Sequence, residues 1–186
     1  DHIDAGDGND SVESRRGNDI INAGEGVDTV RAGGGDDTIA GGLGNDILYG
    51  EGDNDNISGN EGDDTIYGGD GIDTIYGNEG DDTIYAEGGL SSTIDGGSGA
   101  DTITGGVGAD NIGGGSDDDV ITGGAGDDVI RGDSGDDNIN AGDGDDQIDG
   151  GVGVDTISGG AGADRIIGGS GADILSGGAG ADTFLY

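Results

Sequence analysis

A strict nine-residue period constrains this chain more than any other feature of its sequence. One copy of the repeat occupies residues 41–49 and another occupies residues 123–131, and both follow the pattern G-G-x-G-x-D-x-U-x, in which U is a large apolar residue. Twenty copies tile residues 5–185, and residues 1–4 match the last four positions of a further copy. A short unit repeated in phase over this length predicts a solenoid, in which each copy contacts only its neighbours.

The composition by itself favours a disordered chain. The 186 residues include 50 glycines, 42 acidic residues and 5 basic residues, so the formal net charge is −37, and only 29% of the residues are hydrophobic. Low hydrophobicity with high net charge is typical of intrinsic disorder. A disordered acidic sequence has no reason to hold a nine-residue phase, and we therefore predict an ordered fold whenever cations are bound.

The charge and the missing residue types exclude several classes of function. A surface this acidic repels phosphate groups, so we expect no binding to nucleic acid and none to anionic membranes. No stretch approaches the roughly 18 consecutive apolar residues of a membrane-spanning helix, so we expect no membrane insertion by this segment. Cysteine is absent, which removes disulfides, thiol catalysis and cysteine–zinc sites from consideration.

The residues within one copy predict an all-β fold. The first six positions are rich in glycine, which accepts the left-handed backbone angles of tight turns. The last three, such as residues 65–67, have strand propensity and alternate outward, inward and outward. A turn and a short strand in every copy predict a parallel β-roll (a β-solenoid) with two repeats per coil and about ten coils. We expect one such block over residues 1–186, with an irregular copy at 86–95.

The sixth position of the repeat is the candidate metal ligand. Two copies per coil would stack each of these carboxylates about 4.8 Å from the one eighteen residues earlier, and their repulsion requires a cation between them. Carboxylate and backbone carbonyl oxygens together suit Ca²⁺ better than Mg²⁺, which keeps its waters, or zinc, which prefers histidine and cysteine. The predicted ligands are Asp1, Asp10, Asp19, Asp28, Asp37, Asp46, Asp55, Asp64, Asp73, Asp82, Asp101, Asp110, Asp119, Asp128, Asp137, Asp146, Asp155, Asp164, Asp173 and Asp182.

Ion binding has to contribute to folding, because the apolar core is thin. Only the eighth position, one residue in nine, is consistently apolar and inward. Burial of so few side chains cannot offset the conformational entropy of ordering the whole chain. About eighteen Ca²⁺ ions would nearly cancel the net charge of −37. We predict an expanded chain without calcium and a rigid roll with it.

The nonapeptide resembles the repeats-in-toxin (RTX) motif of hemolysin-type calcium-binding proteins, and the resemblance covers essentially the whole chain. It implies a parallel β-roll with Ca²⁺ between successive turns on both edges, and sixth-position aspartates as the side-chain ligands. It also implies export by a type I secretion system in an unfolded, calcium-free form, followed by folding outside the cell. The secretion signal and the effector domain that the family carries are not in this sequence.

Four copies depart from the pattern, and three of them share one edge of the predicted roll. Residues 14–16 replace the glycine-rich start of the second copy, Asp53 replaces a fourth-position glycine, and Ser91 and Ser92 stand where an aspartate is expected. Asp117, in the thirteenth copy, is the exception on the other edge. We predict weaker or missing ions near Arg15, Asp53 and Ser92. The opposite edge, which includes Asp10, Asp28, Asp46, Asp64 and Asp82, should hold a more continuous row.

Other residues have simpler structural explanations. Tyr49, Tyr67 and Tyr85 lie eighteen residues apart and should stack outward on one sheet, with Tyr76 alone on the other; stacking that stiffens the sheet is favoured over a sugar-binding role. His2, the single histidine, has no partner suggesting catalysis or metal binding. The fifth position is often acidic or amide, and a solvated turn is favoured there over a ligand role, as at Asp36, Asn45, Asp63, Asp81, Asp127, Asp136 and Asp145.

Two classes of function remain open at this point. The first is a calcium-responsive folding and export module attached to an exported toxin, protease, lipase or adhesin, with neighbouring domains and the secretion machinery as partners. The second is a recognition surface for ice, glycan or a host surface, although Asn56, Asn111 and Arg165 interrupt the threonines of the seventh position. We expect no enzymatic activity, because no nucleophile has a base beside it. We also expect the segment to come from a larger secreted or cell-surface protein.

Overall fold

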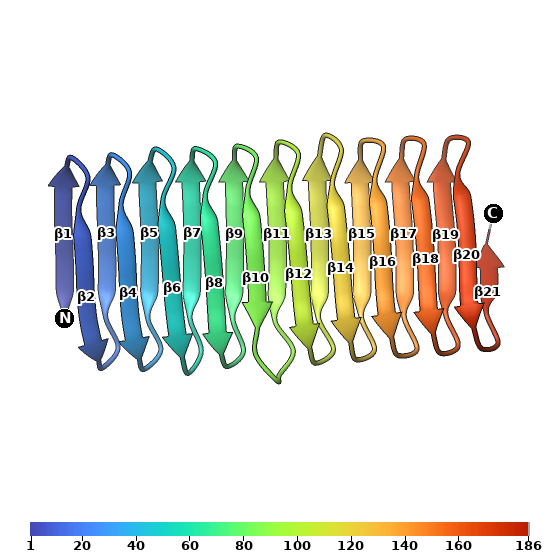
Figure 1. Ribbon diagram of the computed structural model, residues 1–186, viewed down its shortest axis with the longest axis horizontal. Helices are drawn as coiled ribbons and strands as arrows, with labels where there is room; N and C mark the ends of the chain where they lie inside the picture. The colour runs from blue at the N-terminus through green and yellow to red at the C-terminus, as the bar shows by residue number, and fades with distance from the viewer. Residues whose placement is uncertain (186) are drawn as a thin grey trace.

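The computed structural model describes residues 1–185, which form two parallel β-sheets wound into a β-solenoid of about ten coils (Figure 1). Successive strands alternate between the two sheets, and a tight turn joins them at each edge of the roll. No helix is present among these residues, and hence none that could cross a membrane. The predicted all-β parallel roll is confirmed.

The odd-numbered strands form an eleven-stranded sheet and the even-numbered strands form a ten-stranded sheet. The first comprises β1 (His2–Asp7), β3 (Ile20–Glu25), β5 (Thr38–Leu43), β7 (Asn56–Glu61), β9 (Thr74–Glu79), β11 (Thr93–Ser98), β13 (Asn111–Ser116), β15 (Val129–Ser134), β17 (Gln147–Val152), β19 (Arg165–Ser170) and β21 (Thr183–Leu185). The second comprises β2 (Ser11–Arg16), β4 (Thr29–Gly34), β6 (Ile47–Gly52), β8 (Thr65–Asp70), β10 (Thr83–Glu87), β12 (Thr102–Val107), β14 (Val120–Ala125), β16 (Asn138–Asp143), β18 (Thr156–Ala161) and β20 (Ile174–Ala179).

The pairing register confirms two repeats per coil. Ile66 pairs with Ile84, eighteen residues later, and this offset holds along both sheets. Across the irregular copy the offset becomes nineteen, so that Ile84 pairs with Ile103. The extra residue is therefore absorbed in one turn, and every apolar side chain beyond it still faces inward.

The core consists of two inward rows on each sheet, one more than the sequence predicts. The eighth position is buried as predicted, for example at Ile57 and Ile112. The strands, however, extend through the first three positions of the next copy, and the first position points inward again, as Ala23 and Ala141 show. The turn is therefore shorter than predicted, because the first glycine or alanine is small enough to fill the narrow space beneath the turn as part of the strand.

Left-handed backbone angles occur at two positions of the repeat. In one copy Gly124 has a φ of 117° and Gly126 a φ of 135°. Asn60 and Asn78 occupy the first of these positions with φ values of 82°, as expected from the tolerance of asparagine for this conformation. These angles turn the chain sharply enough for two sheets to share one thin core.

Candidate metal centres

The sixth-position aspartates lie immediately before the strands, on the inner side of each turn. Sixteen of the twenty predicted ligands are buried, with at most 3% of their surface exposed. The other four, Asp1, Asp10, Asp173 and Asp182, are in the coils at the two ends and are half-buried or exposed. The fold therefore collects the predicted ligands into two columns, one along each edge of the roll.

One oxygen of each carboxylate is bound by the coil before it. The backbone N–H of Asp46 donates to Oδ1 of Asp64 at 2.7 Å, and that of Asp64 donates to Oδ1 of Asp82 at 2.7 Å. The same bond recurs along both columns. The repulsion that the sequence predicts between stacked carboxylates is thus partly relieved by peptide dipoles, which sequence reasoning did not foresee.

The second oxygen of each buried carboxylate has no partner. Buried polar atoms in folded proteins are almost always hydrogen-bonded, and an unpaired buried charge is costly. The unpaired atoms are Oδ2 of Asp19, Asp28, Asp37, Asp46, Asp55, Asp64, Asp73, Asp82, Asp101, Asp110, Asp119, Asp128, Asp137, Asp146, Asp155 and Asp164.

Where the first position is glycine, the unpaired oxygen faces a small space that it shares with backbone carbonyls. A Cβ atom built on Gly105 would lie 2.6 Å from Oδ2 of Asp110 and 2.6 Å from the carbonyl oxygen of Gly123 in the next coil. Turn carbonyls also approach the neighbouring coil, since a Cβ on Gly35 would lie 2.6 Å from the oxygen of Gly17. A carboxylate and several carbonyls without nitrogen or sulfur ligands fit a hard cation, and Ca²⁺ before Mg²⁺.

These centres do not depend on clusters of ionisable side chains. Among residues 1–185 no group of three or more histidine, cysteine, aspartate or glutamate side chains is placed to hold a metal ion. Each candidate centre has buried carboxylate oxygen from its turns, and the remaining ligands would be backbone carbonyls. This donor set excludes a zinc-type site and fits the small residues, glycine or alanine, at the first position of nearly every copy.

Burial raises the pKa of the column carboxyls well above their usual value. The pKa of Asp64 and of Asp82 rises from 3.8 to about 7, mainly because burial disfavours the charged form, with the neighbouring aspartates of the column adding to the shift. The pKa of Asp46 and of Asp128 rises to about 6 for the same reasons. The hydrogen bond from the preceding backbone N–H opposes these shifts without cancelling them. Without a cation, the columns favour protonation near neutral pH.

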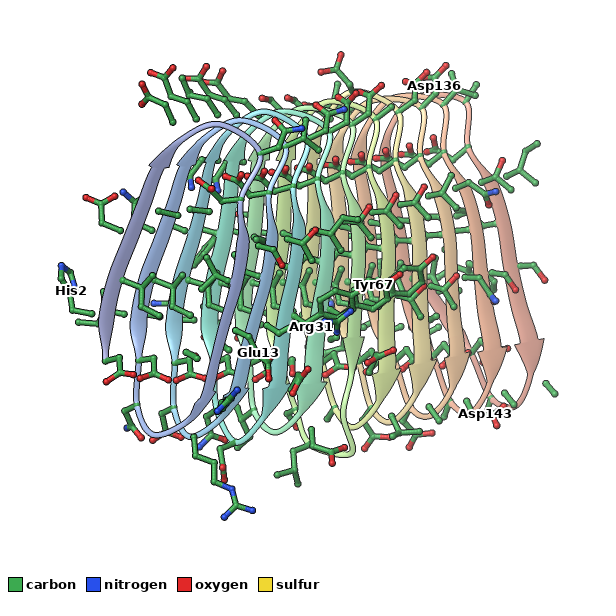
Figure 2. All side chains as sticks on the ribbon, turned by 60° about the vertical axis from the view of Figure 1, so that its left-hand side comes forward. His2, Glu13, Arg31, Tyr67, Asp136 and Asp143 are labelled. Carbon is green, nitrogen blue, oxygen red and sulfur yellow. The ribbon has the colours of Figure 1, made fainter. Side chains whose placement is uncertain are left out.

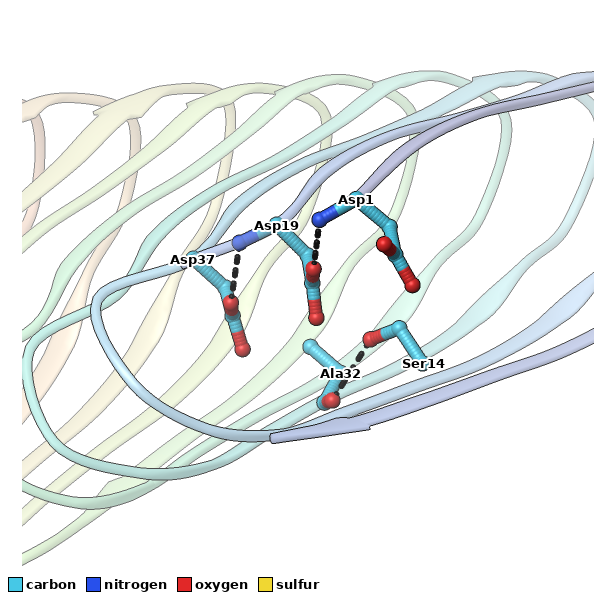
Figure 3. Close-up of polar contacts among 5 residues, drawn as sticks. All are labelled: Asp1, Ser14, Asp19, Ala32 and Asp37. Carbon is cyan, nitrogen blue, oxygen red and sulfur yellow. Dashed lines mark hydrogen bonds and ion pairs between the residues drawn. The ribbon is translucent and has the colours of Figure 1, made fainter. Parts of the chain in front are cut away.

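The second copy fills its own space with a serine. Ser14 stands at the first position, and its hydroxyl donates to the carbonyl oxygen of Ala32 at 2.6 Å beside the carboxylate of Asp19 (Figure 3). The hydroxyl thus lies between the two oxygens that would otherwise face a cation. A weaker ion near Arg15 stays a prediction, because Oδ2 of Asp19 is unpaired like those of the regular turns.

The irregular copy keeps the hydrogen bonds of the column and loses its charge. Ser92 is buried, its hydroxyl accepts the N–H of Asp73 at 3.1 Å, and its own N–H donates to Oδ1 of Asp110 at 2.7 Å. A serine offers one oxygen where an aspartate offers two, so the unpaired oxygen is missing from this turn. The column containing Ser92 is interrupted there, and the column on the opposite edge continues from Asp82 to Asp101.

The fifth-position side chains form a second row that the sequence did not predict. Oδ1 of Asp63 accepts the backbone N–H of Asp81 at 3.1 Å, and Oδ1 of Asp118 accepts that of Asp136 at 2.7 Å. These bonds point toward the following coil, whereas the bonds of the sixth position point toward the preceding one. The fifth position is exposed, as predicted, but it also ties neighbouring turns together. Figure 2 shows Asp136 at the edge of the roll opposite to Asp143.

Acidification of the calcium-free chain is expected to promote folding. The raised pKa values mean that the folded, metal-free state binds more protons than the unfolded state between about pH 4 and pH 7, so its stability falls as the pH rises through that window. Far-UV circular dichroism in chelator should show β-structure appearing below about pH 6. Exposed carboxyls titrate near pH 4, so a transition centred there, or none, would contradict this account.

Replacement of the interrupting serine should restore an ion. Ser92→Asp is expected to add about one bound Ca²⁺ per chain and to raise the melting temperature in calcium, because it supplies the missing carboxylate oxygen. Ser91→Asp adds the same charge at the exposed neighbouring residue and serves as the control. Counting ions by equilibrium dialysis separates the two variants. Equal ion counts in both would show that the column tolerates serine without losing a site.

Comparison with known families gives one result that covers the chain. Its sequence matches the family described as RTX calcium-binding nonapeptide repeat (4 copies) in overlapping segments, at residues 1–30, 22–57, 31–66, 58–90, 91–121, 113–148, 122–157 and 149–184. A search of curated proteins finds no match. The matched segments together run from residue 1 to residue 184 and include both columns of aspartates up to Asp182.

Proposed function

Because this chain belongs to the RTX calcium-binding nonapeptide repeat family, we propose that it folds by binding many Ca²⁺ ions between its coils and serves as the calcium-responsive part of an exported protein. The observation that supports this most strongly is the unpaired, buried Oδ2 atom in each regular turn. A calcium ion bound at each such atom would supply the positive charge that balances the buried carboxylate. The sixth-position aspartates are the ligands we propose.

Calcium binding and folding are coupled in this proposal. The spaces beside the aspartates exist only when coils are stacked, since the carbonyl oxygen next to Asp110 comes from Gly123 of the following coil. An isolated copy therefore cannot form a complete site. Each ion would join two coils, and the free energy of ion binding would be folding free energy. Ions bound in this way would appear cooperatively along the roll.

The number of ions follows from the two columns. Sixteen buried carboxylates have an unpaired oxygen, and about eighteen Ca²⁺ ions would neutralise the net charge of −37. The proposed range therefore reaches about eighteen, with fewer ions on the edge that contains Ser14, Asp53 and Ser92. The opposite edge would carry a continuous row.

We propose an extracellular location, where the calcium concentration would be high enough to fill sites of modest affinity. Extracellular calcium modules bind with dissociation constants of roughly 10⁻⁴ to 10⁻³ M, whereas cytosolic sensors bind more tightly. A chain with weak sites would stay unfolded before export, in the form a type I secretion system handles, and would fold outside the cell. This role is structural, and we propose no catalysis by the segment.

A calcium titration with two neighbouring variants tests the proposal. Asp64→Asn keeps an oxygen that can accept the N–H of Asp46 but removes the charge of the unpaired oxygen. It should raise the half-saturating calcium concentration roughly tenfold, equivalent to about 1.4 kcal/mol. Asp63→Asn makes the same charge change at an exposed residue and should shift the midpoint little.

Two results would contradict different parts of the proposal. Equal shifts in the two variants would show that the overall charge, and not the buried column, governs binding. A midpoint below about 10⁻⁶ M for the unmodified chain would mean folding at cytosolic calcium levels, which contradicts export in an unfolded form. Circular dichroism recorded along the titration reports folding and binding in one experiment.

A further inference from the structure

A groove lies on the outer face of the ten-stranded sheet, and none of the column aspartates lines it. Its volume is about 500 Å³, and its walls include the rings of Tyr49 and Tyr67, the carboxylates of Glu51, Asp70 and Glu87, and the side chain of Val107. We name it the aromatic groove. Neither the calcium centres nor the core requires it.

The irregular copy creates the aromatic groove. Strand β10 ends at Glu87, one residue shorter than its neighbours, and Gly88 and Gly89 follow it. The adjacent coils carry Asp70 and Val107 at the corresponding place, so two residues without side chains leave a hollow between a carboxylate and an apolar wall. The irregular copy therefore changes the structure in two places: it interrupts the aspartate column at Ser92 and it opens a groove on the surface.

Two glutamates flank the aromatic groove in a strained conformation. Glu51 and Glu87 pair with Gly69 from either side, so that their side chains stand on both sides of a glycine. Their φ values are 77° and 66°, in the left-handed region that glycine favours and that glutamate rarely adopts. The second position of the repeat adopts this region throughout the roll, as at Arg15 and Asp133, so the repeat itself fixes the placement of the two glutamates.

The chain itself shows which chemical group these walls accept. The guanidinium of Arg31 lies 4.0 Å from the centroid of the Tyr49 ring and 3.7 Å from the carboxylate of Glu51. Figure 2 labels Arg31 and Tyr67, and both of them contact the ring of Tyr49. A cation over an aromatic ring with a carboxylate at its side is a favourable arrangement. Among residues 1–185 neither Asp70 nor Glu87 forms an ion pair, so two anionic walls remain without a cation.

The stacked tyrosines argue against a sugar as the ligand. The ring centroids of Tyr49 and Tyr67 are 4.8 Å apart, and those of Tyr67 and Tyr85 are 5.1 Å apart, with nearly parallel planes. Both faces of Tyr67 are covered by neighbouring rings, and Tyr49 has Tyr67 stacked on it and Arg31 over its ring, so neither ring that lines the groove offers a sugar an open face. The stack is the predicted tyrosine row on β6, β8 and β10, and it supplies ring edges and hydroxyls to the aromatic groove.

We propose that the aromatic groove binds a basic peptide segment of a partner protein by taking up its arginine or lysine side chains. The cationic group pairs with the carboxylates of Glu87 and Asp70, as Arg31 pairs with Glu51, and lies beside the hydroxyl end of Tyr67. Val107 contacts the aliphatic part of the bound side chain. The net charge of −37 attracts such a segment from a distance, and the groove determines where it docks.

Binding of a short synthetic peptide tests this proposal directly. The probe is Gly-Arg-Gly-Arg-Gly with blocked ends, titrated in saturating Ca²⁺ and followed by tyrosine fluorescence, which is unmasked because the chain has no tryptophan. The double variant Asp70→Asn, Glu87→Gln removes the negative charges of both carboxylates that have no ion-pair partner. The control pairs Asp143→Asn with Glu79→Gln, which changes the charge equally at exposed residues outside the groove.

The unmodified chain and the control should bind the peptide within about twofold of each other, and the groove variant should bind at least roughly tenfold more weakly. A peptide with citrulline in place of arginine has the same shape without the charge and should not bind. Equal weakening in both variants, equal binding of the citrulline peptide, or no saturable binding would overturn the proposal. Circular dichroism of all variants in Ca²⁺ should be unchanged, which would show that a loss of peptide binding does not come from a loss of calcium-dependent folding.

Discussion

The fold depends on one interaction that the protein cannot complete alone. In each regular turn a buried carboxylate oxygen has no partner and needs a cation or a proton beside it. The aspartate before each strand gives Oδ1 to a backbone N–H of the preceding coil and leaves Oδ2 without a partner, as at Asp46 and Asp64. A protein interior tolerates such an atom only when it is protonated or bound to a cation. Acid and calcium are therefore alternative ways to stabilise the same fold.

The rest of the roll is arranged around that requirement. Glycine at the first position of most copies leaves the space beside the carboxylate open. Two left-handed residues in a copy turn the chain tightly enough to bring carbonyl oxygens close to this space. Two rows of side-chain to backbone hydrogen bonds, running in opposite directions along the axis, hold neighbouring turns in register. The thin apolar core aligns the two sheets. Whether the sheets form depends on the carboxylates in the turns being bound to cations or protonated.

Much of this architecture could be predicted from the period alone. The nine-residue phase determines the coil, the eighteen-residue register, the inward row at the eighth position and the columns of aspartates, because strands alternate with a period of two and turns need glycine at particular places. It also predicted the tyrosine row on one sheet and the isolated Tyr76 on the other.

Other features depend on atoms that a pattern does not specify. The inward direction of the first position, seen at Ala23, follows from how far the strand continues past the turn. The hydroxyl of Ser14 between Asp19 and Ala32 follows from the exact approach of two coils. The aromatic groove arises because Gly88 and Gly89 fall beside the tyrosines in three dimensions. The sequence marked the copies that contain Ser14 and Gly88 as irregular without indicating what the irregularity does.

The most direct test of the cation requirement is far-UV circular dichroism at pH 7.5 with the chain first in chelator, then in millimolar Mg²⁺, then in millimolar Ca²⁺. The account predicts a disordered spectrum in chelator, little change with Mg²⁺ and a cooperative change to β-structure with Ca²⁺. A β-sheet spectrum of equal amplitude in chelator would show that the buried carboxylates need no cation and would contradict the account.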